Sequence, residues 1–366
     1  MKRAALALLA VAPALLQARP SAALPPPPIP IRQPAVAPGT IIHLWQPDLS
    51  TWTTSSMPVE NGISGTALFP IAFLNGRFLA AGPLPGRGPT ITNHETSTDG
   101  LQWSEFQMTF SVTSGRSNTT GWSPTSYAYG NGQYLAGFGD GVIYHSTDAV
   151  SWTPIPAATN LSLTAAACGG TTCVFGAQGL IIASTSPQMQ GWSLNYVQTP
   201  LGKVNFNASG MAYGSGLFVG VGMTQPGGGV ATNAIITSPD GVNWKVAASP
   251  PDNLFAVTPT ASGFVAVGSH GTYATSPDGV TWTNGTISLG NPLVGVACGP
   301  TACVAVEKFG GIYATPVNVM SWTRVSSVSG TLSGVAFGAG RFVAYGYLYA
   351  TGALVALTSV SAIPPT

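Results

Sequence analysis

The stretch TSPDGVTW, residues 275–282, has three near-copies elsewhere in the chain. They read STDGLQW at 97–103, STDAVSW at 146–152 and TSPDGVNW at 237–244. Each copy is a short polar turn that a tryptophan closes. Four such turns in 366 residues indicate an internal repeat, which is the sequence signature of a fold assembled from similar units.

Three weaker copies extend the series to seven turns. Two of them have lost the aspartate: STSPQMQGW at 184–192 and TPVNVMSW at 315–322. The third, QPDLSTW at 46–52, keeps Asp48 four residues before Trp52. The aspartates that remain in the series are Asp48, Asp99, Asp148, Asp240 and Asp278, and the closing tryptophans are Trp52, Trp103, Trp152, Trp192, Trp244, Trp282 and Trp322.

A second motif alternates with these turns and also occurs seven times. AYGNGQYLAGFG at 128–139 and AFGAGRFVAYG at 336–346 are two examples. Each is a short apolar strand, a Gly or Asn turn and a second strand, which is the pattern of a β-hairpin. One repeat therefore holds four short strands, which we call A to D, with the Asp–Trp turn between C and D. Residues 40–366 divided among seven repeats give about 47 residues each, the size of one propeller blade.

The two ends of the chain carry complementary parts of one repeat. The chain opens with an Asp–Trp turn that lacks a first hairpin, and it closes with a first hairpin followed by ALVALTSVSA at 353–362. Joining the two ends completes a seventh blade and leaves no open sheet edge. We therefore predict an all-β fold: a seven-bladed β-propeller of four-stranded antiparallel blades, whose ring is closed by strands from both termini.

The turn sequences resemble a shortened form of the Asp-box, or BNR, repeat of sialidase-like propellers in the WD40/YVTN/BNR-like group. This resemblance extends over nearly all of residues 40–366. It implies the propeller fold but no single function, because such propellers include glycosidases, assembly factors and binding modules. Sialidases hold their substrate with three arginines near the channel, and the predicted A strands contain none. Sialidase activity is therefore not expected.

We expect the repeat aspartates to be structural. An aspartate at this position accepts hydrogen bonds from backbone N–H groups of its own turn, and the preceding Ser or Thr ties the turn from the other side. Gly100, Gly241 and Gly279 follow the aspartate and tolerate a positive φ. The tryptophan packs its indole against the edge of the sheet. A catalytic or calcium-binding role for these carboxylates is the alternative interpretation.

The four cysteines form two C-x4-C pairs, Cys168 with Cys173 and Cys298 with Cys303. Each pair lies at the A–B hairpin of its repeat. In an exported protein this pattern predicts two disulfides, each joining neighbouring strands. A zinc site is the alternative, but the spacing is wrong and no histidine is adjacent to either pair. We expect no metal and no cofactor.

The N-terminus indicates export. Residues 1–23 combine a basic start, a short apolar stretch and small residues for cleavage, as a bacterial-type signal peptide does. Residues 24–39 are proline-rich and predict a stiff linker, which leaves 40–366 for the propeller. No later stretch is long and apolar enough for a transmembrane helix. We predict a secreted or periplasmic location.

The composition excludes some classes of partner. Only 6% of the residues are charged and the net charge is +1, so nothing indicates binding to nucleic acid or to an anionic membrane. We expect a protein or glycan partner. We expect the protein to be a monomer.

Variation between repeats is concentrated in the B–C loops, which should share one face of the disc. Loop residues on a rigid scaffold often bind ligands. The candidates at these turns are Asp140, Gln178, His270, Glu307 and Phe309. Alternatively, these positions hold ordinary turn residues. His94 and Glu95 follow the first long loop and are expected on the same face.

These observations favour an exported, non-catalytic binding or scaffolding propeller that docks a protein or glycan on its B–C face. The alternative is a carbohydrate-active hydrolase or lyase on the same scaffold. A glycosidase needs two carboxyl groups a few ångströms apart, and the candidates come from different blades. A lyase that uses His270 with Glu307 from the neighbouring blade is the most specific form of the alternative.

Overall fold

The computed structural model describes residues 49, 51–56, 70–82, 91–109, 123–155, 160–186, 188–225, 229–287, 290–351 and 353–359. The chain divides into two units, Met1–Leu44 and Trp45–Thr366, and all described residues belong to the second. The predicted signal peptide, the predicted linker and Asp48 lie outside the described residues.

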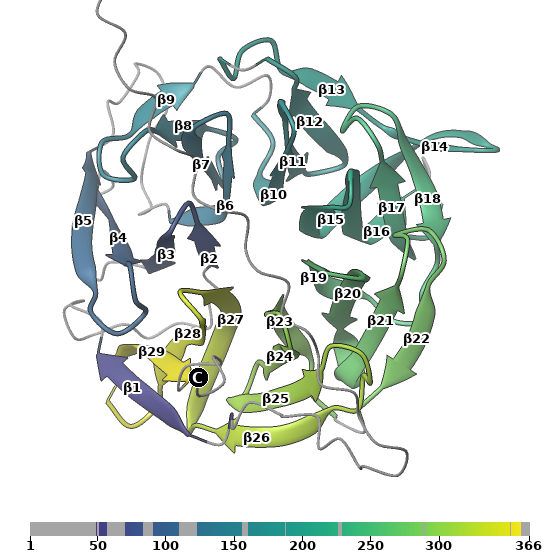
Figure 1. The fold of residues 1–366 in the computed structure, drawn as a ribbon. Coiled ribbons are helices and arrows are strands. Elements are labelled where there is room, and N and C mark those ends of the chain that lie inside the picture. The colour runs from purple at the N-terminus through teal and green to yellow at the C-terminus, as the bar shows by residue number, and fades with distance from the viewer. Residues whose placement is uncertain are drawn as a thin grey trace, which may run out of the picture. The chain divides into compact units, whose positions relative to one another are not determined.

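Seven antiparallel sheets form a ring, which is a seven-bladed β-propeller (Figure 1). This confirms the predicted fold class. Blade 1 holds β2 (Ile71–Leu74), β3 (Arg77–Gly82), β4 (Ile91–Ser97) and β5 (Ser104–Thr109), and blade 2 holds β6 (Pro124–Gly130), β7 (Gln133–Phe138), β8 (Ile143–Ser146) and β9 (Thr153–Ile155). Blade 3 holds β10 (Leu163–Gly169), β11 (Thr172–Ala177), β12 (Leu180–Ser184) and β13 (Ser193–Asn195).

The remaining blades follow in chain order. Blade 4 holds β15 (Gly202–Gly214), β16 (Leu217–Gln225), β17 (Thr232–Ser238) and β18 (Trp244–Ala248), with an extra strand β14 (Val197–Thr199). Blade 5 holds β19 (Leu254–Thr260), β20 (Gly263–Gly268), β21 (Thr272–Ser276) and β22 (Thr283–Thr286), with a short 3-10 turn η1 (Ser269–Gly271). Blade 6 holds β23 (Leu293–Cys298), β24 (Ala302–Glu307), β25 (Gly311–Pro316) and β26 (Thr323–Ser327).

Blade 7 combines strands from both parts of the chain. Its inner strands are β27 (Gly330–Gly338), β28 (Arg341–Leu348) and β29 (Leu354–Ser359), and its outer strand is β1 (Trp52–Ser56). β1 pairs antiparallel with β29, in a register that runs from Trp52 opposite Ser359 to Ser56 opposite Val355. The ring is therefore closed by strands from the two ends of the propeller, as the offset between the two motifs predicted.

Blade 4 has one feature that the repeat did not predict. β14 forms a hairpin with the start of β15 and also runs parallel to the outer strand β18, with Val197 opposite Trp244. This extra strand covers the outer edge of the blade, and Trp244 is only 1% exposed. An edge strand that is paired in this way offers fewer free backbone groups to other chains.

The Asp–Trp turn of blade 5 shows how the repeated sequence folds. Asp278 Oδ1 accepts hydrogen bonds from the backbone N–H groups of Val280 and Thr281, at 2.8 and 2.7 Å. Ser276 Oγ accepts one from Gly279 N at 2.7 Å. These bonds stabilise the ionised carboxylate, and they hold the pKa of Asp278 at about 2. The turns that contain Asp99, Asp148 and Asp240 have the same bonds.

Five of the seven tryptophans donate their indole N–H to a carbonyl of their own turn; Trp282, for example, bonds Gly279 O at 2.9 Å. The others are Trp52, Trp103, Trp192 and Trp244. Trp152 and Trp322 have no such bond within the described residues. Trp152 instead stacks on His94, with ring centroids 5.8 Å apart.

The turn glycine also packs against the neighbouring blade. Gly279 has φ +73°, and a Cβ at this position would lie 2.6 Å from Leu217 Cδ2, on the B strand of blade 4. Gly241 contacts the B strand of blade 3 in the same way, and Gly100 contacts that of blade 7. At these three turns the glycine suits both the conformation and the small space between blades, whereas Ala149, Met189 and Met320 hold the same position with a positive φ in other turns. The sequence indicated only the first reason.

The two predicted disulfides are present. Cys168 pairs with Cys173 across β10 and β11, and Cys298 pairs with Cys303 across β23 and β24. In four other blades the same two positions hold a pair of aromatic rings packed at a tilt or edge to face, such as Phe337 and Phe342, with centroids 4.7 Å apart. Disulfides of this kind are characteristic of an oxidising, extracellular-type environment.

Candidate functional site

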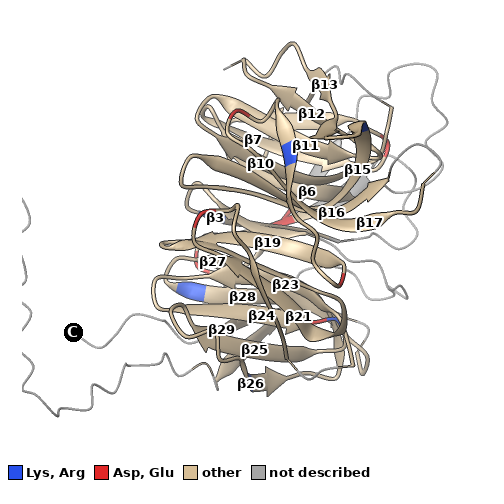
Figure 2. Ribbon diagram, turned by 90° about the vertical axis from the view of Figure 1, so that its right-hand side faces the viewer, with Lys and Arg blue, Asp and Glu red and all other residues tan. Residues whose placement is uncertain are grey.

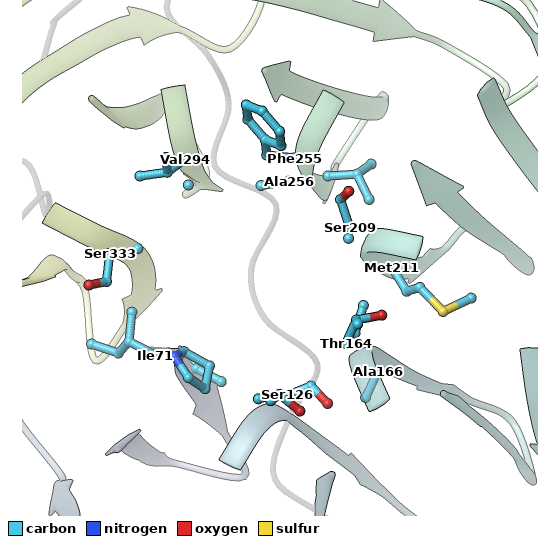
Figure 3. A pocket seen from close by; sticks show the side chains of 18 of the residues that line it. Ile71, Ser126, Thr164, Ala166, Ser209, Met211, Phe255, Ala256, Val294 and Ser333 are labelled. Atoms are coloured by element: carbon cyan, nitrogen blue, oxygen red, sulfur yellow. The ribbon is translucent and has the colours of Figure 1, made fainter. Parts of the chain in front are cut away.

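A cavity of about 690 Å³ lies where the A strands of all seven blades converge (Figure 3). It is lined by residues of all seven A strands, and it also includes Lys308 from the B–C loop of blade 6. The cavity is therefore at the B–C end of the channel. A pocket of this size is in the range that binds a small ligand.

A β-bulge at the same place in six A strands builds the wall. The register with the B strand shifts by one residue there, so one residue has no partner opposite it. All six bulge residues line the cavity: Thr125, Thr164, Ser209, Phe255, Val294 and Ser333. The sequence did not predict these bulges, because the hairpin pattern is the same with or without them.

The four hydroxyl groups at the bulges are not equivalent. Thr125 Oγ1 donates to Gly137 O at 2.9 Å, and Thr164 Oγ1 donates to Gly176 O at 3.1 Å. These two hydroxyls satisfy carbonyls on their own B strands. Ser209 and Ser333 form no hydrogen bond to any described residue through their hydroxyls. Of the four bulge hydroxyls, those of Ser209 and Ser333 are thus available to a ligand as donors.

Lys308 is the one charged side chain among the described residues that line the cavity. Its backbone N–H donates to Pro292 O at 3.0 Å, and its carbonyl accepts from Leu332 N at 3.1 Å. These bonds hold the backbone of Lys308 between blades 6 and 7, beside the bulge residue Ser333. No described carboxylate forms an ion pair with its ammonium group. The other described residues that line the cavity are uncharged.

The candidates that the sequence suggested all lie outside the described cavity wall. Asp140 Oδ1 accepts from Val142 N at 3.1 Å, within its own turn. Gln178 is exposed, and its backbone N–H bonds Ser162 O. Phe309 is 52% exposed. The proposal that these side chains bind a ligand stays a prediction.

His270 belongs to a small polar group on blade 5. Its Nδ1 lies 3.3 Å from Asp252 Oδ1, and Thr272 Oγ1 donates to Asp252 Oδ2 at 2.6 Å. The hydrogen bond from Thr272, and then the His270 ring, lower the pKa of Asp252. His270 itself has φ +54°, in the left-handed region.

Glu307 is turned away from the surface. It is 6% exposed, accepts a hydrogen bond from Asn291 Nδ2, and lies 3.4 Å from the hydroxyl of Tyr313. The two residues that a lyase would combine therefore have separate partners: His270 contacts Asp252, and Glu307 contacts Asn291 and Tyr313.

The B–C loops of blades 6 and 7 present exposed aromatic rings. Phe309 is joined on this surface by Tyr349, which is 54% exposed. The hydroxyl of Tyr349 lies 3.1 Å from Thr331 Oγ1, and its backbone N–H donates to Ser329 O. Gly310 O accepts from Val328 N, so the two loops contact the same short connection. Sequence reasoning missed Tyr349, although the run YLYATG at 347–352 was a usable signal.

The expectation that His94 and Glu95 belong to the B–C face was wrong. Both are in strand β4 and both are completely buried, because the blades on either side cover them. The hydroxyl of Tyr127 lies 2.6 Å from His94 Nδ1. Burial lowers the pKa of His94 to about 3. Burial, and then the charge of Glu105, raise the pKa of Glu95 to about 8.

The described residues present no concentrated charge. In Figure 2 the few basic and acidic positions are scattered over the ribbon. Within the described ranges, no three His, Cys, Asp or Glu side chains come together as a metal site. No helix in that part of the chain is long and apolar enough to cross a membrane.

No protein-family model and no curated protein matches this sequence. Solved structures match its fold. The structure of YCF48 bound to a D1 peptide superposes with a TM-score of 0.60, at 16% identity, over 87% of this chain and 98% of that one. A chain of the mitotic checkpoint complex gives 0.60 at 11% identity, over 90% and 98%. PorZ of Porphyromonas gingivalis gives 0.57 at 12% identity, over 83% of this chain and 48% of that one.

Proposed function

We propose that this protein is an exported binding propeller on which a protein partner docks at the B–C face of blades 6 and 7. The observation that carries the proposal is the pair of exposed rings, Phe309 and Tyr349, on adjoining loops. Exposed aromatic residues are the side chains that contribute most at protein interfaces. The rigid ring of blades holds both loops in place.

The comparisons support a binding role by analogy. YCF48 was solved with a D1 peptide, and another similar chain is part of the mitotic checkpoint complex. PorZ is described as a surface component of a secretion system. Propellers in all three cases belong to assemblies with other proteins. A glycan partner is the alternative for the same face, since aromatic rings also pack against sugars.

Export and repeat type belong to the same proposal. The two disulfides support an oxidising compartment, and residues 1–23 have the composition of a signal peptide. Residues 24–39 are then a linker and 40–366 the propeller domain. The hydrogen bonds of the Asp278 turn support the assignment of these repeats to the Asp-box type.

The carbohydrate-active alternative has less support. Catalysis by a carboxylate requires that it reach the substrate, and Glu307 is buried and held by two neighbours. His270 and Asp252 form a pair on the surface, but hydrolysis needs two suitably spaced carboxyl groups.

Site-specific photo-cross-linking in the producing cell tests the docking face. A photoreactive phenylalanine analogue replaces Phe309 in one variant and Val280 in another. Val280 is also exposed, at 44%, but it lies on the Asp–Trp turn of blade 5. We expect a discrete protein adduct from position 309 that is absent from position 280. Adducts from position 280 only, or from neither position, would contradict the proposal.

A glycan array separates the two partner classes. Mature protein and a Phe309→Ser/Tyr349→Ser double variant are applied to the same array. Binding to a defined glycan that the double variant loses would replace the protein partner with a carbohydrate. We expect no glycan binding that depends on these two rings.

A further inference from the structure

We propose that the central cavity binds a small unbranched carboxylic acid with an apolar tail, its carboxylate held by Lys308 and Ser333. This site adjoins the docking face, because Lys308 and Phe309 are consecutive in one loop, but the inference does not depend on the proposed partner. It follows from the size of the cavity, the chemistry of its wall and the position of Lys308, the one charged side chain among the described lining residues.

The wall of the cavity is mainly hydrocarbon. Ile71, Met211, Phe255 and Val294 reach it from four different blades, and alanines fill positions between them (Figure 3). Its volume of about 690 Å³ is that of a site for a small molecule. Apolar surface that a ligand covers here leaves water, which favours an aliphatic tail.

One end of the cavity offers a place for an anion. Lys308 lines the cavity and has no carboxylate partner among the described residues. The backbone bond from Leu332 N to Lys308 O puts this residue next to Ser333, whose hydroxyl is free to donate to a ligand. An ammonium group and a hydroxyl together suit a carboxylate, because its ionised oxygens accept a charge-assisted hydrogen bond from each of them.

The same wall disfavours other ligands. A peptide in the cavity would bring backbone N–H and C=O groups along its whole length, and each would need a partner. Thr125 and Thr164 already donate their hydroxyl hydrogens to their own blades. A sugar would need several more side-chain donors and acceptors, and no described carboxylate, Asn or Gln lines the cavity. A hydrocarbon tail makes no such demand.

Binding of decanoate and of 1-decanol to the mature protein, measured by titration calorimetry below the micellar range, tests the proposal. The two probes share a tail and differ in the head group. We expect saturable binding of both, with decanoate at least about tenfold tighter, the ratio that one charge-assisted hydrogen bond supplies. Lys308→Met should bring the ratio close to one, and Lys308→Arg should retain most of it.

The matched control is Lys245→Met, because Lys245 is an exposed lysine on the outer strand β18. It should leave both affinities unchanged. Ser209→Phe, which fills the cavity, should weaken both probes without changing their ratio, and circular dichroism verifies that each variant is folded. No saturable binding of decanoate would overturn the proposal. The proposal would also be overturned if Lys308→Met left the ratio of the two affinities unchanged. A third such result would be a peptide that binds through its free C-terminus more tightly than decanoate does and loses this advantage in Lys308→Met.

Discussion

The hydroxyl of Tyr127 lies 2.6 Å from Nδ1 of His94, which joins the A strand of blade 2 to the C strand of blade 1. Both residues are buried, and Tyr127 also lines the central cavity. One hydrogen bond therefore connects the wall of the cavity with the interior between two blades. The other ring nitrogen of His94 has no partner among the described residues, so this histidine depends on Tyr127.

Loss of that hydroxyl should destabilise the protein. Tyr127→Phe leaves His94 without its one hydrogen-bond partner in the described part of the chain, and a buried polar group left unpaired costs about 1–3 kcal/mol. Urea unfolding measures the change in free energy of unfolding. Tyr213→Phe is the control, since the Tyr213 hydroxyl has no hydrogen bond to a described residue. Equal effects of the two substitutions would show that the bond to His94 contributes nothing specific.

The protein should be more stable near pH 7 than near pH 9, a range that lies above the ordinary pKa of His94, whose titration acts in the opposite direction. The pKa of Glu95 is raised from 4.5 to about 8 in the folded state, first by burial and then by Glu105. Between these two values the unfolded chain is ionised at this residue while the folded chain still holds the proton, so the free energy of unfolding falls as pH rises.

Substitution of the carboxyl group isolates this effect. In Glu95→Gln the difference in free energy of unfolding between pH 7 and pH 9 should shrink, because the amide does not titrate. Glu105→Gln should retain most of the difference, since burial is the larger cause. If Glu95→Gln preserves the full pH dependence of stability, another residue takes up the proton that causes it.

Two glycines with the same backbone conformation should respond differently to alanine. Gly132 has φ +75° and nothing within 4 Å of an added Cβ, whereas at Gly279, with φ +73°, the Cβ would lie 2.6 Å from Leu217. Gly132→Ala should cost about 1–2 kcal/mol for the left-handed backbone alone. Gly279→Ala should cost about 1–3 kcal/mol more because of the contact between blades. Chemical denaturation of both variants measures the difference in free energy of unfolding. Equal losses would mean that Leu217 of blade 4 moves aside at no measurable cost.

Each disulfide should contribute modestly to stability. The loop that Cys168 and Cys173 close is short, with a sequence separation of 5, so its removal should cost about 2 kcal/mol. Cys168→Ala/Cys173→Ala and the equivalent change at Cys298 and Cys303 should have similar, additive effects, since the two pairs are three blades apart. Urea titration of the single-pair and double-pair variants measures this. A much larger loss from one pair would indicate that its blade, and not only its hairpin, depends on the bond.

The architecture could be predicted because it is local and repeated. The turn around Asp278 closes with bonds between residues no more than three positions apart, so its sequence specifies its shape. Seven copies of that turn, alternating with hairpins, then determine the number of blades. The offset of the two motifs even predicted that β1 pairs with β29. The cysteine spacing predicted both disulfides for the same reason.

The candidate sites depend on contacts between blades, which the repeat does not encode. Glu95 and Glu307 look like surface charges in the sequence, but both are buried in the folded protein. The bulge at Ser333 is likewise invisible in a hairpin pattern, since it is a shift of one residue in strand pairing. The sequence by itself determined the fold, because a local turn is repeated seven times and the two ends carry complementary parts of one blade, which closes the ring. Only the tertiary structure decided which side chains line the cavity, because burial and pairing are set by the neighbouring blade.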